Sequence, residues 1–142
     1  MKAFSRRSAV VGSAAASVIA FGAAPSAVAN MVAMDAPTGK DTTIAPGLVM
    51  RAYGENPSII PGFKAVRLID FIMQPGSKTG ADPMPNPMVC HMLDGELRVV
   101  QDGKETVRKT NDVWTCNTGT HEQAFNDSKA VAVMRMTFLM PA

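Results

Sequence analysis

Charge is scarce in this sequence, and its balance with apolar residues already excludes several classes of protein. Only 18% of the 142 residues are charged and 46% are hydrophobic, which excludes an intrinsically disordered chain. The formal net charge of +2 gives no support for a nucleic-acid-binding protein. The length suits one domain and leaves no room for a catalytic domain with a separate regulatory domain.

Short catalytic motifs are also missing. Histidine and cysteine each occur only twice. No C-x-x-C or H-x-H spacing, phosphate-binding glycine loop, zinc-protease helix or Ser-His-Asp arrangement is present. The sequence therefore names neither a reaction nor a substrate by motif.

The basic residues Lys2, Arg6 and Arg7 stand at the N-terminus, and residues 8–34 behind them contain no ionisable side chain. This asymmetry predicts a targeting segment. Its apolar stretch is short and diluted by glycine and serine, and so falls below the ~20 strongly apolar residues that a spanning helix needs. Residues 5–10, Ser-Arg-Arg-Ser-Ala-Val, resemble a twin-arginine export signal, a route that carries folded proteins, often with a cofactor.

The small-x-small pattern of a signal-peptidase site follows at residues 27–29, Ala-Val-Ala. We expect residues 1–29 to be a cleaved signal peptide and the mature protein to be periplasmic or secreted, without stable membrane insertion. An uncleaved anchor and a general secretory signal are the alternatives. Cleavage removes three basic residues and no acid, so 11 Lys and Arg remain against 12 Asp and Glu, a net charge of −1.

The mature chain is typical of a β protein. Residues 30–46 lack periodicity and are predicted to be a flexible arm or linker. Asp102-Gly103 predicts a two-residue hairpin turn, and the proline-rich residues 75–87 predict a rim loop. Without sustained helical periodicity, we expect an antiparallel barrel or sandwich with strands near residues 48–53, 64–73, 88–93, 96–101, 104–109, 112–116, 122–125 and 130–140.

Two segments resemble the conserved motifs of the small single-domain cupins. Residues 76–95 fit the frame of their first motif, G-x5-H-x-H-x3-E-x6-G. Residues 111–126 fit the frame of the second, G-x5-P-x-G-x2-H-x3-N. The resemblance implies an all-β double-stranded β-helix, or jelly-roll barrel, over residues 47–142, and it implies a homodimer.

The metal-ligand positions of those motifs have changed. Asp82, Met84 and Met88 stand where the first motif has two His and a Glu, and Glu122 stands at the His of the second motif. The iron or manganese centre that the resemblance would imply is therefore not expected here. A hard cation held by Asp82 and Glu122 is a weaker alternative.

Strand alternation predicts that Met88, Cys90 and Met92 share one face and point into the barrel. Cys116 precedes the turn that presents His121 and Glu122, so we expect it near the same cavity. Three interpretations stay open for the two cysteines: a disulfide, two buried thiols, or a soft-metal site for copper or zinc with ligands from Cys90, Cys116, His121 and Glu122.

His121 and Glu122 are the candidate acid/base residues, with Glu122 predicted to point inward and His121 to lie at the rim. Met88 and Met92 either fill the core or line a ligand cavity, and Trp114 is either a core or dimer-interface anchor or a ligand platform. The leading hypothesis is an exported cupin-like barrel that binds a small molecule or a soft metal ion. The alternatives are a metal-dependent enzyme, dioxygenase- or isomerase-like, with a rebuilt site, and a non-catalytic structural subunit.

Overall fold

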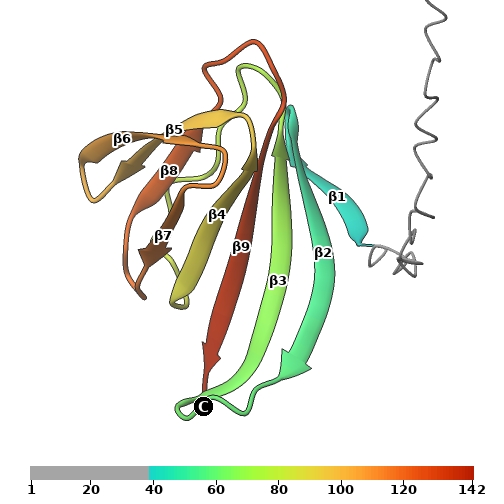
Figure 1. Cartoon of the computed structure of the whole chain (residues 1–142), viewed down its shortest axis with the longest axis vertical. Coiled ribbons are helices and arrows are strands. Elements are labelled where there is room, and N and C mark those ends of the chain that lie inside the picture. Colours follow the sequence, from blue (N-terminus) through green and yellow to red (C-terminus); the bar gives the residue numbers. More distant parts are fainter. Residues whose placement is uncertain (1–38) are drawn as a thin grey trace, which may run out of the picture. The chain divides into compact units, whose positions relative to one another are not determined.

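The computed structural model describes residues 39–142, which form two β-sheets (Figure 1). One sheet has the strand order β1-β2-β3-β9-β4-β7 and the other has the order β6-β5-β8. Within residues 39–142, no helix is long and apolar enough to cross a membrane. The strands of this part of the chain are β1 (Lys40–Ala45), β2 (Leu48–Pro57), β3 (Phe63–Met73), β4 (Met88–Asp94), β5 (Glu96–Gln101), β6 (Lys104–Lys109), β7 (Val113–Cys116), β8 (Glu122–Phe125) and β9 (Ala132–Pro141).

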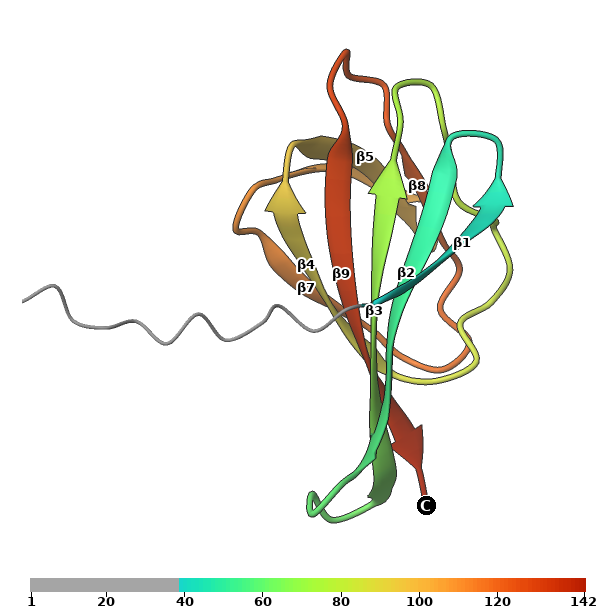
Figure 2. The same ribbon diagram turned by 90° about the vertical axis from the view of Figure 1, so that its right-hand side faces the viewer.

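The predicted all-β architecture is confirmed. The predicted runs 96–101, 104–109 and 122–125 coincide with β5, β6 and β8. Asp102 and Gly103 have φ angles of 47° and 80°, as a two-residue turn with both central residues left-handed requires. The smaller sheet lies behind the larger one in Figure 2, so the inner faces of both sheets enclose the core.

One strand was not expected. Residues 30–46 were predicted to be an arm, but Lys40–Ala45 forms β1 and pairs with β2. The missed signal is the β-branched run Thr42-Thr43-Ile44, which suits an extended edge strand although its burial is slight. Arg51 of β2 binds Asp41 through two hydrogen bonds of 2.7 and 2.8 Å. Residues 30–38 and the predicted signal peptide lie outside the described residues.

Register across the larger sheet sorts its inner face into rows of side chains. Each row contains one residue from each of several neighbouring strands, because paired residues of antiparallel strands point to the same side. The inner position of Met88, Cys90 and Met92 is confirmed, with 1%, 0% and 0% exposure. One row is Arg67, Phe138, Met88 and Cys116, the next is Ile69, Met136, Cys90 and Trp114, and a third is Met50, Phe71, Met134 and Met92.

The predicted rim loop, residues 75–87, is tied to β8. The backbone N–H of Thr79 donates to the carbonyl of Ala124, while the N–H of Ala124 donates to Thr79 Oγ1, both at 2.9 Å. Further along, the N–H of Met84 donates to the carbonyl of Thr120 at 2.8 Å. These bonds hold the loop over the inner face of the larger sheet.

Asn126, the last position of the second motif, joins the end of β8 to the larger sheet. Its side chain is fully buried, and Nδ2 donates to the carbonyls of Met73 and Ala130, each at 2.8 Å. Its Oδ1 accepts hydrogen bonds from the backbone N–H and the hydroxyl of Ser128. All the hydrogen-bonding capacity of this amide is thus used within the fold.

Replacing Asn126 with alanine should destabilise the domain by about 2–4 kcal/mol, because the carbonyl of the buried Met73 loses this donor, the hydrogen bonds to Ala130 and Ser128 are lost, and a cavity opens. Urea unfolding followed by circular dichroism measures the change. The neighbouring Asp127→Ala variant is the control, since the ion pair of Asp127 with Arg98 is exposed and should contribute little. Equal stability of Asn126→Ala and wild type would contradict the structural role of this amide.

Candidate functional site

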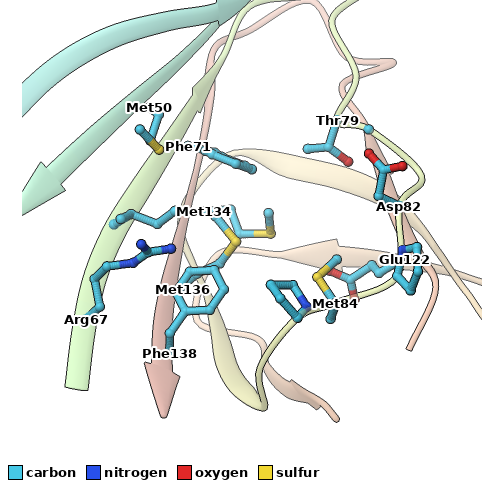
Figure 3. Close-up of a pocket in the computed structure, with 14 residues that line it drawn as sticks. Met50, Arg67, Phe71, Thr79, Asp82, Met84, Glu122, Met134, Met136 and Phe138 are labelled. Atoms are coloured by element: carbon cyan, nitrogen blue, oxygen red, sulfur yellow. The ribbon is translucent and has the colours of Figure 1, made fainter. Parts of the chain in front are cut away.

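A pocket of about 290 Å³ opens on the inner face of β2, β3 and β9, beneath the loop of residues 79–85 (Figure 3). Apolar side chains make most of its wall, and three ionisable side chains reach it: Arg67, Asp82 and Glu122. The apolar side chains in the wall are Met50, Ile69, Phe71, Pro83, Met84, Pro85, Met134, Met136 and Phe138. The rim loop, which is hydrogen-bonded to β8, therefore covers a cavity.

Three of the four motif positions line this pocket, namely Asp82, Met84 and Glu122, whereas Met88 is packed in the core. The resemblance therefore located the pocket. The four motif positions together carry two carboxylates and two thioethers, and such a set does not suit the imidazole-rich iron or manganese centre expected of intact motifs. Asp82 is exposed and belongs to the rim loop.

Three chemically active side chains meet beside the pocket. One ligand atom each from Cys90, Cys116 and Glu122 can be chosen so that all three lie within 4.8 Å of one another. All three residues are buried, with exposures of 0%, 3% and 3%. They come from β4, β7 and β8, so the group is assembled across both sheets. Glu122 belongs both to this cluster and to the pocket wall.

The Glu122 carboxylate is held by donors from β7. Trp114 Nε1 donates to Glu122 Oε2 at 2.8 Å, and Cys116 Sγ donates to the same oxygen at 3.1 Å. Oε1 accepts no hydrogen bond from the side chains of residues 39–142. Gln101 Nε2 approaches Cys116 Sγ at 3.7 Å and donates to the carbonyl of Thr115 at 2.9 Å. One carboxylate oxygen is therefore fixed and the other is free for a further partner.

The two cysteines are free thiols in the structure. Cys90 pairs with Trp114 and Cys116 pairs with Met88, so the cysteines are diagonal neighbours on adjacent strands. Diagonal Cα atoms lie ~7–8 Å apart, whereas disulfides favour ~5.5–6 Å. Of the three interpretations of the cysteines, this register disfavours the disulfide and leaves buried thiols or metal ligands.

The environment of Cys90 keeps it protonated. The pKa of its thiol is raised well above the ordinary value by its hydrogen bond with the Cys116 side chain, then by burial, then by the Glu122 carboxylate. The positive charge of Arg108 acts in the opposite direction. Without a bound cation, Cys90 is therefore an inert thiol.

The predicted site residues other than Cys90, Cys116 and Glu122 are not members of this cluster. Glu122 points inward and His121 lies exposed at the rim, as alternation predicted. His121 Nδ1 is 3.4 Å from the carbonyl oxygen of Ala81, and the ring is not part of the Cys-Glu group. Met92 is wholly buried, and neither it nor Trp114 is in the pocket wall. Trp114 packs in the core, with the Arg108 guanidinium 4.9 Å from its ring centre.

Arg67 is a pocket residue that the sequence analysis missed. It lines the pocket from β3, among the inward positions Ala65, Ile69 and Phe71. An arginine in phase with an apolar strand face is a signal that the sequence contains. Gln101 was also missed, because its approach to Cys116 depends on how the two sheets face each other.

Comparisons with known proteins address the fold. No protein-family model matches the sequence, and no curated protein matches it. Solved structures do match. An RmlC-like cupin from Shewanella frigidimarina is 18% identical, with a TM-score of 0.61, and the match covers 73% of this chain and 85% of that one. KdgF from Halomonas sp. is 11% identical, with a TM-score of 0.59, and the match covers 70% and 86%.

A cupin 2 conserved barrel domain protein from Salinispora arenicola is 15% identical, with a TM-score of 0.57, over 68% of this chain and 79% of that one. At sequence identities this low, these structural matches support a conclusion about the fold alone. Together with the two-sheet topology and the two motif frames, they show that residues 39–142 have the double-stranded β-helix fold of the cupins.

Proposed function

We propose that this protein is an exported cupin barrel that binds a thiophilic metal ion through Cys90, Cys116 and Glu122. The supporting observation is the convergence of these three ligand atoms, all within 4.8 Å of one another, in the interior of the barrel. A carboxylate is costly to bury, so its burial beside two thiols suits a site that binds a cation.

The chemistry of the donors favours zinc, with copper(I) as the second choice. Thiolates select these ions over iron, manganese or magnesium, and a carboxylate ligand suits zinc better than copper(I). Zinc lies ~2.3 Å from sulfur and ~2.0–2.2 Å from oxygen, so around a tetrahedral zinc two sulfur ligands are ~3.8 Å apart and a sulfur and an oxygen are ~3.6 Å apart. The ligand atoms of the cluster lie within 4.8 Å of one another, so zinc would draw them together by at most about 1 Å.

Three protein ligands are the number found in zinc sites that keep one position for water or substrate. Glu122 lines the pocket, so an ion that it binds would be reachable from there. The pocket also argues against a structural subunit with a filled barrel. A metal-dependent enzyme with a rebuilt site remains compatible with this arrangement.

Export is the second part of the proposal. It rests on Arg6-Arg7, the weakly apolar stretch behind them and the small-x-small pattern of residues 27–29. A twin-arginine route would carry the barrel folded, with its ion already in place. That order of events suits a metal site buried between two sheets.

Purified wild-type protein should bind one zinc ion per chain, and the Cys90→Ala and Glu122→Gln variants should bind it at least ~100-fold more weakly, because each lacks a direct ligand. Metal content after gel filtration and competition with a chromophoric chelator measure this. Cobalt(II) in place of zinc should show thiolate-to-metal charge-transfer absorption that the Cys90→Ala variant lacks.

The matched control is His121→Ala, which removes the predicted ligand that lies outside the cluster and should leave zinc affinity unchanged. Thiol titration of the unfolded, chelator-treated protein should find two free thiols. A protein with no free thiols, or a wild type that takes up neither zinc nor copper(I), would rule out the metal site.

Trp114→Phe should weaken zinc binding ~10- to 100-fold while the chain stays folded, because the variant keeps the apolar ring but loses the Nε1 donor that orients Glu122. The chelator competition and a thermal melt on the same sample separate affinity from stability. Unchanged affinity would show that Glu122 needs no such support.

Replacing both Arg6 and Arg7 with lysine should leave uncleaved precursor in the cytoplasm of a bacterial host that has the twin-arginine pathway, because that route reads the arginine pair. Cell fractionation and the mass of the mature chain, expected to begin at Asn30, provide the measurement. Lys2→Gln, which leaves the pair intact, should still be exported. Export of the double-lysine variant would point to the general secretory route.

A further inference from the structure

Arg67 stands on the wall of the pocket without a partner. Its guanidinium carbon is 5.0 Å from the ring centre of Phe138, its cross-strand neighbour on β9. Its Nε is buried and donates no hydrogen bond. Within residues 39–142, no carboxylate forms an ion pair with Arg67, and Glu55, opposite it on β2, is exposed.

Arg67 is half-buried, and its buried Nε–H is costly to leave without an acceptor. Its planar guanidinium presents donors in a fork that matches a carboxylate, and stacking on an aromatic ring holds that fork in place. Three other arginines on the sheets, Arg51, Arg98 and Arg135, each form an ion pair with an aspartate, and Arg135 binds Asp70 at 2.7 and 2.9 Å. Arg108 shares with Arg67 a buried Nε without a partner, but it does not line the pocket. The charge of Arg67 is directed at the pocket, and the missing partner fits a ligand.

The opposite wall sets the rest of the ligand's chemistry. Figure 3 shows Arg67 on one side of the pocket and Asp82 and Glu122 on the other, with methionine and phenylalanine side chains between them. The volume of about 290 Å³ lies just below the ~300–1,000 Å³ of small-molecule sites. A molecule that fits must be small and apolar in the middle, with an acidic group at one end.

We propose that the pocket binds a small aromatic monocarboxylate that carries a hydrogen-bond donor at its far end. The carboxylate pairs with Arg67, the ring packs against Phe71, Met134 and Met136, and the donor group faces Asp82 and Glu122. A phosphate dianion is disfavoured, because a single guanidinium faces it and the two carboxylates opposite repel a second negative charge. This ligand site does not depend on the proposed metal.

The test uses 4-hydroxyphenylacetate and its uncharged analogue 4-hydroxyphenylacetamide. Each is titrated into the mature protein in the presence of a chelator, and binding is measured by calorimetry and NMR. The acid should bind ~10- to 100-fold more tightly than the amide, because only the acid forms a charge-assisted pair with Arg67. Arg67→Met should remove that preference, and Arg67→Lys should retain part of it, since an ammonium is a point charge without the fork.

Arg108→Met is the matched control. Arg108 also has a buried Nε without a partner and also lies over an aromatic ring, Trp114 at 4.9 Å, but it is outside the pocket wall. That variant should keep the preference for the acid. Thermal melts confirm that each variant is folded, and chemical-shift changes should fall on Phe71 and Met134.

Several results would overturn the proposal. They are equal affinity for acid and amide, an Arg67→Met variant that still prefers the acid, tighter binding of inorganic phosphate than of the acid, and no saturation of wild type at millimolar acid. Repeating the titration with zinc separates the two proposals. Acid binding by a protein that takes up no metal refutes only the metal site, and zinc binding without acid binding refutes only this one.

Discussion

A carboxylate enclosed in an apolar barrel is the constraint on which this site depends. Glu122 is 3% exposed, and a charge at that depth is tolerated only if donors meet it. Trp114 and Cys116 supply those donors from β7, both to Oε2. The pairing of β7 with β4 then sets Cys90 opposite Trp114, which brings the second thiol to the same place. One acidic residue at the start of β8 thus determines what must gather around it.

Strand alternation explains how a cupin frame can lose its histidines and keep a site. The frame positions Asp82, Met84 and Glu122 still line the cavity, because the rim loop is tied to β8 by backbone hydrogen bonds that do not depend on those side chains. The sulfur donors of the proposed metal site come from the neighbouring inward positions Cys90 and Cys116. In that proposal soft ligands stand in place of the imidazoles of the intact motifs, and this difference alters which ions suit the barrel.

The separation along the chain of the residues that form each interaction explains which features the sequence predicted. Period-two alternation is local, so the inward Met88-Cys90-Met92 face, the inward Glu122 and the rim position of His121 were all predictable. The motif frames supplied the fold and the place of the pocket. Cross-strand register and the way the two sheets face each other are not local properties of the sequence. The diagonal placement of the cysteines and the approach of Gln101 to Cys116 therefore could not be predicted from it. Arg67 and β1 did have local signals. Arg67 falls in the alternation of inward apolar residues along its strand, and β1 contains a run of β-branched residues.

The opposite charges of the pocket do not neutralise each other, because the fold keeps them apart. Arg67 is fixed on β3 of the larger sheet and Glu122 on β8 of the smaller one, and the apolar rows of β3 and β9 lie between them. The cavity is consequently polarised, which favours one orientation of a ligand with an acidic end. A cation bound at Glu122 would offset the negative end and favour the acidic group of the ligand, but it would also occupy one of the two acceptors that the donor end of the ligand faces and leave that role to Asp82. The two proposed sites can therefore stand alone, and the charge of a bound cation would act on the two ends of the ligand in opposite directions.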